Sequence, residues 1–219
     1  MNKNIIITII AMIMCIGLAT AFSGLGSGTP EDPYQISTLS ELNETRNDLT
    51  ANYILTSDIN ASITCTTPLI PIGSSGLPGW TPDLMFNGSF NGQNHTIFNM
   101  CTPGGLFGAI INPGIIMNLR LINITAVQGS IPWVGCVAGE ISHGILRNIY
   151  VQGSVTGDSI GLLVGRGRNS GELIDNCEAI GTITATGCNV GGLTSQMYGI
   201  INNSYALTNI TGGGCSSPG

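Results

Sequence analysis

The sequence predicts an all-β fold, a parallel β-helix or β-solenoid of repeats about 26 to 31 residues long, with a short N-terminal capping helix. Three observations lead to this fold class. A glycine-led apolar block and an asparagine-centred block recur together, apolar and polar residues alternate within each copy, and one copy is too short to bury its apolar face alone. Units of this kind become stable by stacking on one another.

The glycine-led block occurs four times, at residues 104–108, 135–139, 161–165 and 191–195. Each copy is followed by a block centred on an asparagine, and the four centres are Asn118, Asn148, Asn176 and Asn203. The residue two before each centre is aliphatic, and the residue five after it is small or polar. This alternation predicts short strands separated by corners at glycine and asparagine, and no helical period fits it.

Stacking determines which residues face each other on neighbouring coils. Parallel strands of adjacent coils place equivalent residues about 4.8 Å apart. We therefore expect the four asparagines to form a ladder, in which side-chain amides hydrogen-bond from coil to coil at a turn that tolerates left-handed backbone angles. The same register predicts two inter-coil ion pairs, Arg147 with Asp175 and Glu140 with Arg166.

The chain divides into a signal peptide at 1–21, an N-terminal capping module with the first coils at 22–102, four repeats at 103–211 and a flexible cysteine-containing tail at 212–219. Thr38 and Glu41 form a capping-box pattern that starts a short helix. Further short strands are expected at 53–55, 71–73, 86–92 and 95–97, and the proline-containing stretch 65–83 is expected to lie on the outside as a loop. Nothing predicted after the last repeat closes it, so its strand edge should be open.

The first 21 residues have the pattern of a secretory signal. Lys3 precedes an apolar run at 5–18, and the small-x-small sequence at 19–21 predicts cleavage after Ala21. The apolar run is too short to span a bilayer. Without this segment the chain has five arginines and twelve acidic residues, so its net charge is 5 − 12 = −7. This charge disfavours nucleic acid and anionic membranes as partners.

An exported chain with an even number of cysteines favours disulfides. Six cysteines follow the predicted signal peptide and are the candidates: Cys65, Cys101, Cys136, Cys177, Cys188 and Cys215. Cys215 is expected to pair with Cys188 or with a neighbouring subunit. Seven sequons are candidate glycosylation sites: Asn43, Asn60, Asn87, Asn94, Asn123, Asn202 and Asn209.

The sequence predicts no metal, no cofactor and no catalytic site. It has no Cys-x-x-Cys pair, and His95 and His143 stand alone in the sequence. The group most similar to a catalytic site is Asp158 with Arg166 and Arg168, since a carboxylate beside two guanidiniums could bind or deprotonate a uronic acid. A solvated loop pair is the favoured interpretation of these three residues, so we expect that the protein is not an enzyme.

The glycine blocks at 104–108, 161–165 and 191–193, each with its asparagine block, resemble the GLUG repeats of archaeal and bacterial surface proteins. Residues 26–36, Asp58-Ile59 and 86–97 resemble the leader module that precedes such repeats. The resemblance covers nearly the whole chain after the signal peptide. It implies a cell-surface or adhesin-like protein, such as an archaeal sheath or envelope protein, and it is specific for architecture more than for activity.

Three functions follow in order of preference. The first is a secreted structural subunit of an extracellular layer or sheath, which assembles with itself through its solenoid edges and through intermolecular disulfides. The second is an adhesin or carbohydrate-binding module, in which aromatic side chains stack on cell-surface glycans; the candidates are Trp80, Trp133, Tyr150 and Tyr205. The third is a polysaccharide-active enzyme that uses Asp158.

Overall fold

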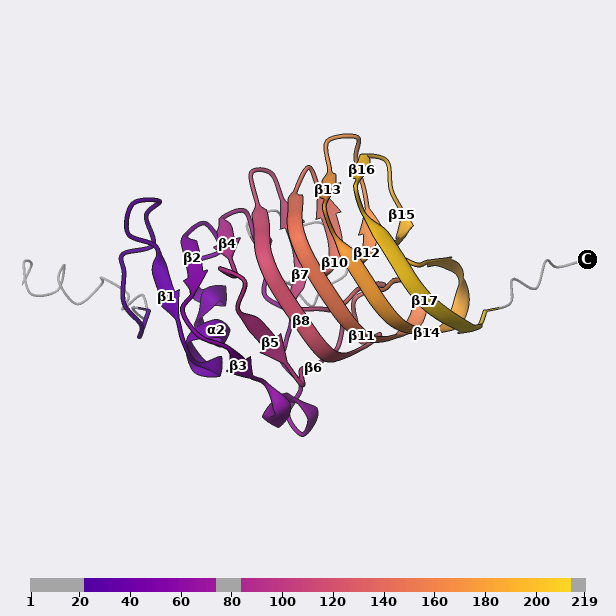
Figure 1. Cartoon of the computed structure of the whole chain (residues 1–219), viewed down its shortest axis with the longest axis horizontal. Coiled ribbons are helices and arrows are strands. Elements are labelled where there is room, and N and C mark those ends of the chain that lie inside the picture. The colour runs from indigo at the N-terminus through magenta and orange to yellow at the C-terminus, as the bar shows by residue number, and fades with distance from the viewer. Residues whose placement is uncertain (1–21, 74–83, 214–219) are drawn as a thin grey trace, which may run out of the picture.

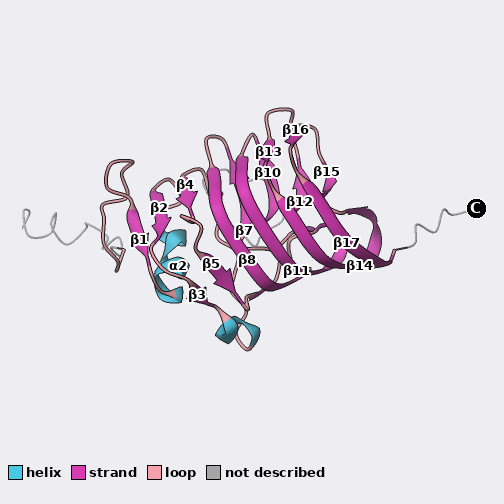
Figure 2. Ribbon diagram, viewed as in Figure 1, coloured by secondary structure: helices cyan, strands magenta, loops and turns pink. Residues whose placement is uncertain are grey.

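The computed structural model describes residues 22–73 and 84–213, which form a parallel β-solenoid elongated from its N-terminal to its C-terminal end (Figure 1). The predicted fold class is confirmed, because the regular secondary structure of the described residues is nearly all β-strand and the helices lie near the N-terminal side (Figure 2). The helices are α2 (Leu39–Glu44) and the 3-10 helices η1 (Thr45–Asn47) and η2 (Ser62–Cys65). The strands are β1 (Tyr34–Ile36), β2 (Asn52–Leu55), β3 (Ile59–Asn60), β4 (Ser89–Asn91), β5 (Thr96–Phe98), β6 (Cys101–Thr102), β7 (Phe107–Ile111), β8 (Ile115–Val127), β9 (Trp133–Val134), β10 (Ala138–Ser142), β11 (Ile145–Gly161), β12 (Val164–Gly167), β13 (Leu173–Asp175), β14 (Glu178–Gly191), β15 (Thr194–Gln196), β16 (Ile200–Asn202) and β17 (Tyr205–Gly212).

Two sheets form the walls of the solenoid. The main path of the larger sheet runs β1-β2-β4-β8-β11-β13-β16, and β14 and β17 continue it beside β11. The smaller sheet has the order β15-β12-β10-β7. The long strands pair in parallel, β8 with β11, β11 with β14 and β14 with β17. From β7 onward, each coil therefore adds one strand to both walls.

The core is a set of rows in which each coil contributes one apolar side chain. Ile116, Leu146 and Ile174 follow one another along one row and are fully buried. Toward the N-terminal half the core becomes aromatic, and the ring centroids of Phe86 and Phe107 lie 4.9 Å apart. Burial of these rows supplies most of the free energy that holds successive coils together.

The N-terminal end of the solenoid is closed by local structure. Thr38 caps helix α2, and the reciprocal capping box with Glu41 is complete. Before the helix, the chain runs along the outer side of β1, where the Gln35 amide donates to the Leu25 carbonyl at 2.8 Å. Within the described residues no helix is long and apolar enough to cross a membrane.

The prediction of an outer loop over residues 65–83 is wrong for its middle part. Leu69 and Ile72 are buried, and Ile72 forms a parallel bridge with Phe107 beside the smaller sheet. The reason is that β7 would otherwise have an unpaired edge next to the core, and the backbone of Ile72 hydrogen-bonds to that edge through the Leu106 carbonyl and the Gly108 amide. Residues 74–83 lie outside the described part.

Candidate functional site

The asparagine corner connects four coils through side-chain amides. Asn148 donates to Asn118 Oδ1 at 2.9 Å, Asn176 donates to Asn148 Oδ1 at 2.8 Å, and Asn118 donates to Asn91 Oδ1 at 3.0 Å. Asn118, Asn148, Asn176 and Asn203 all have positive φ angles, between 46° and 54°. Asparagine tolerates this left-handed conformation, and its side-chain amide can then hydrogen-bond to the asparagine of the neighbouring coil. Asn203 has the same backbone conformation in the last described coil.

A second asparagine corner was missed by the sequence analysis. Asn123 donates to Asn99 Oδ1 at 2.7 Å, and both residues have positive φ angles. Asn123 is an extra residue opposite the next strand, where the register shifts between Gln152 and Gly153. In later coils glycine occupies this position. The corner at Gly181 has no room for a side chain, because a Cβ there would lie 1.8 Å from the Gly153 carbonyl oxygen. Because the residue type at this corner changes from coil to coil, no single residue recurs in the sequence to indicate the corner.

The two predicted ion pairs are formed in the structure but differ in burial. Arg147 Nε lies 3.2 Å from Asp175 Oδ2, where the arginine is half exposed. Arg166 Nη2 lies 2.7 Å from Glu140 Oε2, and the Glu140 side chain is almost fully buried. The Arg166 guanidinium also lies 3.4 Å from the ring centroid of Trp133. One face of the Trp133 ring is thus covered by the protein itself; Trp80 lies outside the described residues.

The candidate catalytic group is not assembled. Arg166 and Arg168 both reach Glu140, at 2.7 and 3.4 Å, and Asp158 lies on β11 with its backbone amide bonded to the Gln128 side chain. His95 Nδ1 lies 3.2 Å from Asp58 Oδ1. The Thr96 amide also donates to that carboxylate, and this bond together with His95 lowers the pKa of Asp58. Across the described ranges, no group of three metal-ligating side chains occurs.

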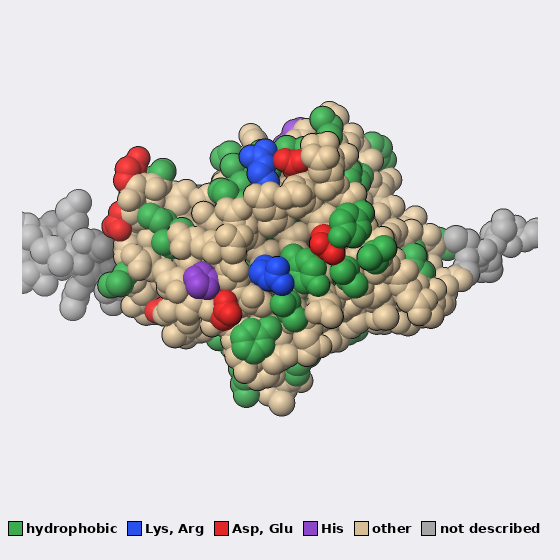
Figure 3. All heavy atoms as spheres, in the orientation of Figure 1, with side chains coloured by type: hydrophobic (Ala, Val, Ile, Leu, Met, Phe, Trp, Pro, Cys, Tyr) green, Lys and Arg blue, Asp and Glu red, His purple; other side chains and the backbone are tan. Residues whose placement is uncertain are grey.

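A shallow groove of about 300 Å³ runs across successive coils beside the asparagine corner. The strand register puts Arg120, Tyr150, Glu178 and Tyr205 in one row along this groove. The Arg120 guanidinium lies 4.6 Å from the Tyr150 ring centroid, and the Tyr205 hydroxyl donates to Glu178, which raises the pKa of that phenol. Figure 3 shows this alternation of basic, apolar and acidic side chains as a diagonal row.

The last coil exposes large apolar side chains. Six residues of this coil are exposed: Tyr198, Ile200, Ile201, Tyr205, Leu207 and Ile210. Its strands β15, β16 and β17 pair with β12, β13 and β14 on one side. No described strand pairs with their other side. We call the surface formed by the ends of the inner rows, with Ile201 and Ile210, the end face.

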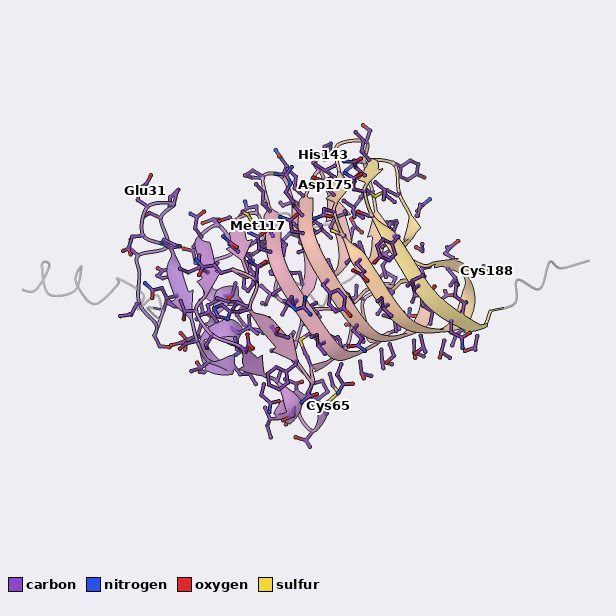
Figure 4. The ribbon with its side chains drawn as sticks, viewed as in Figure 1. Glu31, Cys65, Met117, His143, Asp175 and Cys188 are labelled. Carbon is purple, nitrogen blue, oxygen red and sulfur yellow. A yellow bond between two sulfur atoms is a disulfide. The ribbon has the colours of Figure 1, made fainter. Side chains whose placement is uncertain are left out.

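The cysteines divide into bonded and buried ones. Cys65 and Cys101 form a disulfide, and Cys188 is also disulfide-bonded; Cys65 and Cys188 lie far apart along the solenoid (Figure 4). Cys136 and Cys177 are not disulfides, contrary to the prediction, because both point into the core as small apolar side chains. Cys215 lies outside the described residues, so its predicted partner stays a prediction.

Most sequon asparagines lie on the surface. Asn87 is the half-buried one, and its Oδ1 is buried without a hydrogen-bond partner among the described residues. Asn123 and Asn202 donate through their side-chain nitrogens to Asn99 and Asp175, and a glycan would be attached to these same nitrogen atoms. The exposed members are Asn43, Asn60, Asn94, Asn123, Asn202 and Asn209. Glycosylation stays a prediction.

The fold and these surfaces define a class of protein, the parallel β-solenoids that present rows of side chains along an extended lateral face. The chain matches no protein-family model, so membership of the GLUG-repeat proteins stays a prediction.

Two sequence relatives and one solved structure are similar to the chain. It is 36% identical over 174 residues to halomucin from Haloquadratum walsbyi, and this alignment covers 72% of the chain and 2% of halomucin. It is 34% identical over 161 residues to a protein named as a Gly-rich membrane protein from Evansella cellulosilytica, which covers 68% of the chain and 18% of that protein. A structure named as an immunoglobulin A1 protease from Bacteroides ovatus has a TM-score of 0.57 at 21% identity over 86% of this chain and 69% of that one, and this likeness shows the fold alone.

The asparagine corner can be tested at Asn148, which both donates and accepts in the ladder. Asn148→Gly keeps the left-handed backbone and loses two partly exposed hydrogen bonds, a cost of about 1 kcal/mol. Asn148→Ala loses the same bonds and adds about 1 to 2 kcal/mol for an alanine at positive φ. Urea unfolding should therefore rank the wild type above the glycine variant and the glycine variant above the alanine variant. An alanine variant as stable as the glycine variant would contradict the strained corner.

The buried thiols predict a loss of stability in alkali. Burial raises the pKa of Cys177 from 9.0 to about 11 and raises that of Cys136 even further. Above pH 9 the unfolded thiols lose protons that the folded ones keep, so the free energy of unfolding falls by up to about 1.4 kcal/mol per pH unit for each thiol. Unfolding curves between pH 9 and 10 should show this slope, and the Cys136→Ala, Cys177→Ala double variant should be flatter. Equal slopes would contradict the prediction.

Proposed function

We propose that the chain is a structural subunit of an extracellular layer at the cell surface, and that it associates with itself through the end face. The similarity to a halomucin and to a protein named as a membrane protein supports a location at the cell surface. The predicted signal peptide, which falls outside the described residues, supports export. The end face supplies the contact.

The observation that carries the proposal is the exposure of core rows in the last coil. Ile201 is 42% exposed, although Ile174, its equivalent one coil earlier, is fully buried. Ile210 is 47% exposed, although Ile183 beside it is fully buried. The end face is therefore a cross-section of the hydrophobic core, and such surfaces are typical of obligate interfaces.

The backbone of the last coil adds a directional element to this contact. The outer edge of β17 (Tyr205–Gly212) presents amide and carbonyl groups that pair with no described strand. Unpaired edges bind other strands through main-chain hydrogen bonds. An apolar surface beside an open edge fits a second copy of the same coil.

The closed N-terminal end limits how copies join. The segment before β1 covers that end (Figure 1), so the last coil of one copy has no equivalent open coil at the start of the next. The end faces of two copies therefore meet each other, related by a two-fold axis, with their β17 strands antiparallel. A layer then needs a second contact in addition to the end face.

Substitution of the end face tests the association. The oxidised chain from residue 22 should form dimers or larger species in size-exclusion chromatography with light scattering. The Ile201→Asp, Ile210→Asp double variant should be monomeric, because two carboxylates would be buried without partners in the contact. Both side chains are already exposed in the isolated chain, so the variant should fold, as circular dichroism would verify.

A matched control comes from an exposed apolar residue elsewhere. Ile63 is 63% exposed on η2, in the N-terminal half. Ile63→Asp should associate as the wild type does. A wild type that stays monomeric at high concentration, with no disulfide-linked species in the cell envelope, would rule the proposal out.

A further inference from the structure

We infer that the groove beside the asparagine corner binds a linear, uncharged polysaccharide whose chain runs along the solenoid axis. The site lies on the lateral face and includes neither Ile201 nor Ile210, although Tyr205 stands at the start of β17. Binding in the groove can therefore succeed or fail independently of the proposed self-association.

The groove has the shape that an extended polymer needs. It is open to solvent and crosses successive coils, so a linear ligand can enter it from the side and extend beyond it at either end. Its lining includes the corner asparagines Asn148 and Asn176. These two residues are held by the ladder, which makes this part of the lining rigid before any ligand binds.

The two tyrosines have a spacing that suits a sugar chain. Tyr150 and Tyr205 stand in the same row with Glu178 between them, two rungs apart. Two rungs correspond to about 9.6 Å. This distance matches every second ring of an extended hexopyranose chain, so each tyrosine can stack against the apolar face of one sugar while the ring between them lies over Glu178.

The polar groups of the row complement hydroxyl groups. Arg120 supplies donors and Glu178 supplies acceptors, on either side of the Tyr150 ring. The two charges balance, so the groove has no net preference for a cationic or an anionic polymer. Nucleic acid is disfavoured, because its phosphates need several cationic side chains and the row supplies one arginine. A peptide strand is disfavoured too, because such strands bind at a sheet edge and the groove lies on a sheet face.

Titration calorimetry with soluble oligosaccharides tests the inference. Cellohexaose, an uncharged hexamer, should bind the folded chain, and cellobiose should bind much more weakly because it reaches one tyrosine at a time. Tyr150→Ala should weaken hexamer binding by about tenfold or more, since it removes the central stacking surface. Tyr150→Phe should bind nearly as the wild type does, because it keeps the ring.

The control variant removes an exposed tyrosine outside the groove. Tyr198 is exposed and contacts Gln196 after β15, away from the row; Tyr198→Ala should leave hexamer binding unchanged. Chitohexaose extends the test to a second uncharged polymer, and hexagalacturonate tests an acidic one. Absence of binding by both uncharged hexamers, equal binding by Tyr150→Ala, or tighter binding of hexagalacturonate would overturn the inference.

Discussion

Parallel pairing between equivalent residues of successive coils is the interaction on which the rest of the structure depends. Each residue of one coil lies about one strand spacing from its counterpart in the next, so rows of like residues form along the axis. A row of polar residues stabilises the stack if its members hydrogen-bond to one another, as the side-chain amides of Asn118, Asn148 and Asn176 do. The left-handed backbone at these positions turns the chain without leaving its polar groups unpaired.

The same repetition explains why the two ends differ. A row of core side chains has to stop at each end, and its last member then faces solvent unless something covers it. At the N-terminal end, the segment before β1 provides that cover (Figure 1). At the other end Ile201 and Ile210 belong to rows that are buried in every preceding repeat, and no described residue covers them. The apolar end face follows from periodicity and requires no additional motif.

The sequence predicted those parts of the structure that repeat with unchanged chemistry. Two blocks at a constant spacing determined the register, and the register alone placed Arg147 opposite Asp175. It could not predict features in which the residue type changes between coils. The second corner changes from Asn99 and Asn123 to glycine, and Ile72 joins the smaller sheet from a stretch rich in proline. The reduced state of Cys177 depends on its burial, which cysteine counting does not report.

The groove brings these points together, because it lies where the fold constrains residue identity least. The corner positions require a residue that accepts a positive φ angle, and four coils use asparagine there. Two residues later the side chain points outward, and successive coils carry Arg120, Tyr150, Glu178 and Tyr205. Stacking requires only that neighbours in this row be compatible, as the arginine over a tyrosine ring is. A rigid corner beside a row whose residue types can vary lets the solenoid present different side chains at a fixed spacing. In this chain the row has an aromatic ring at every second rung, which is the arrangement that a chain of sugars would need.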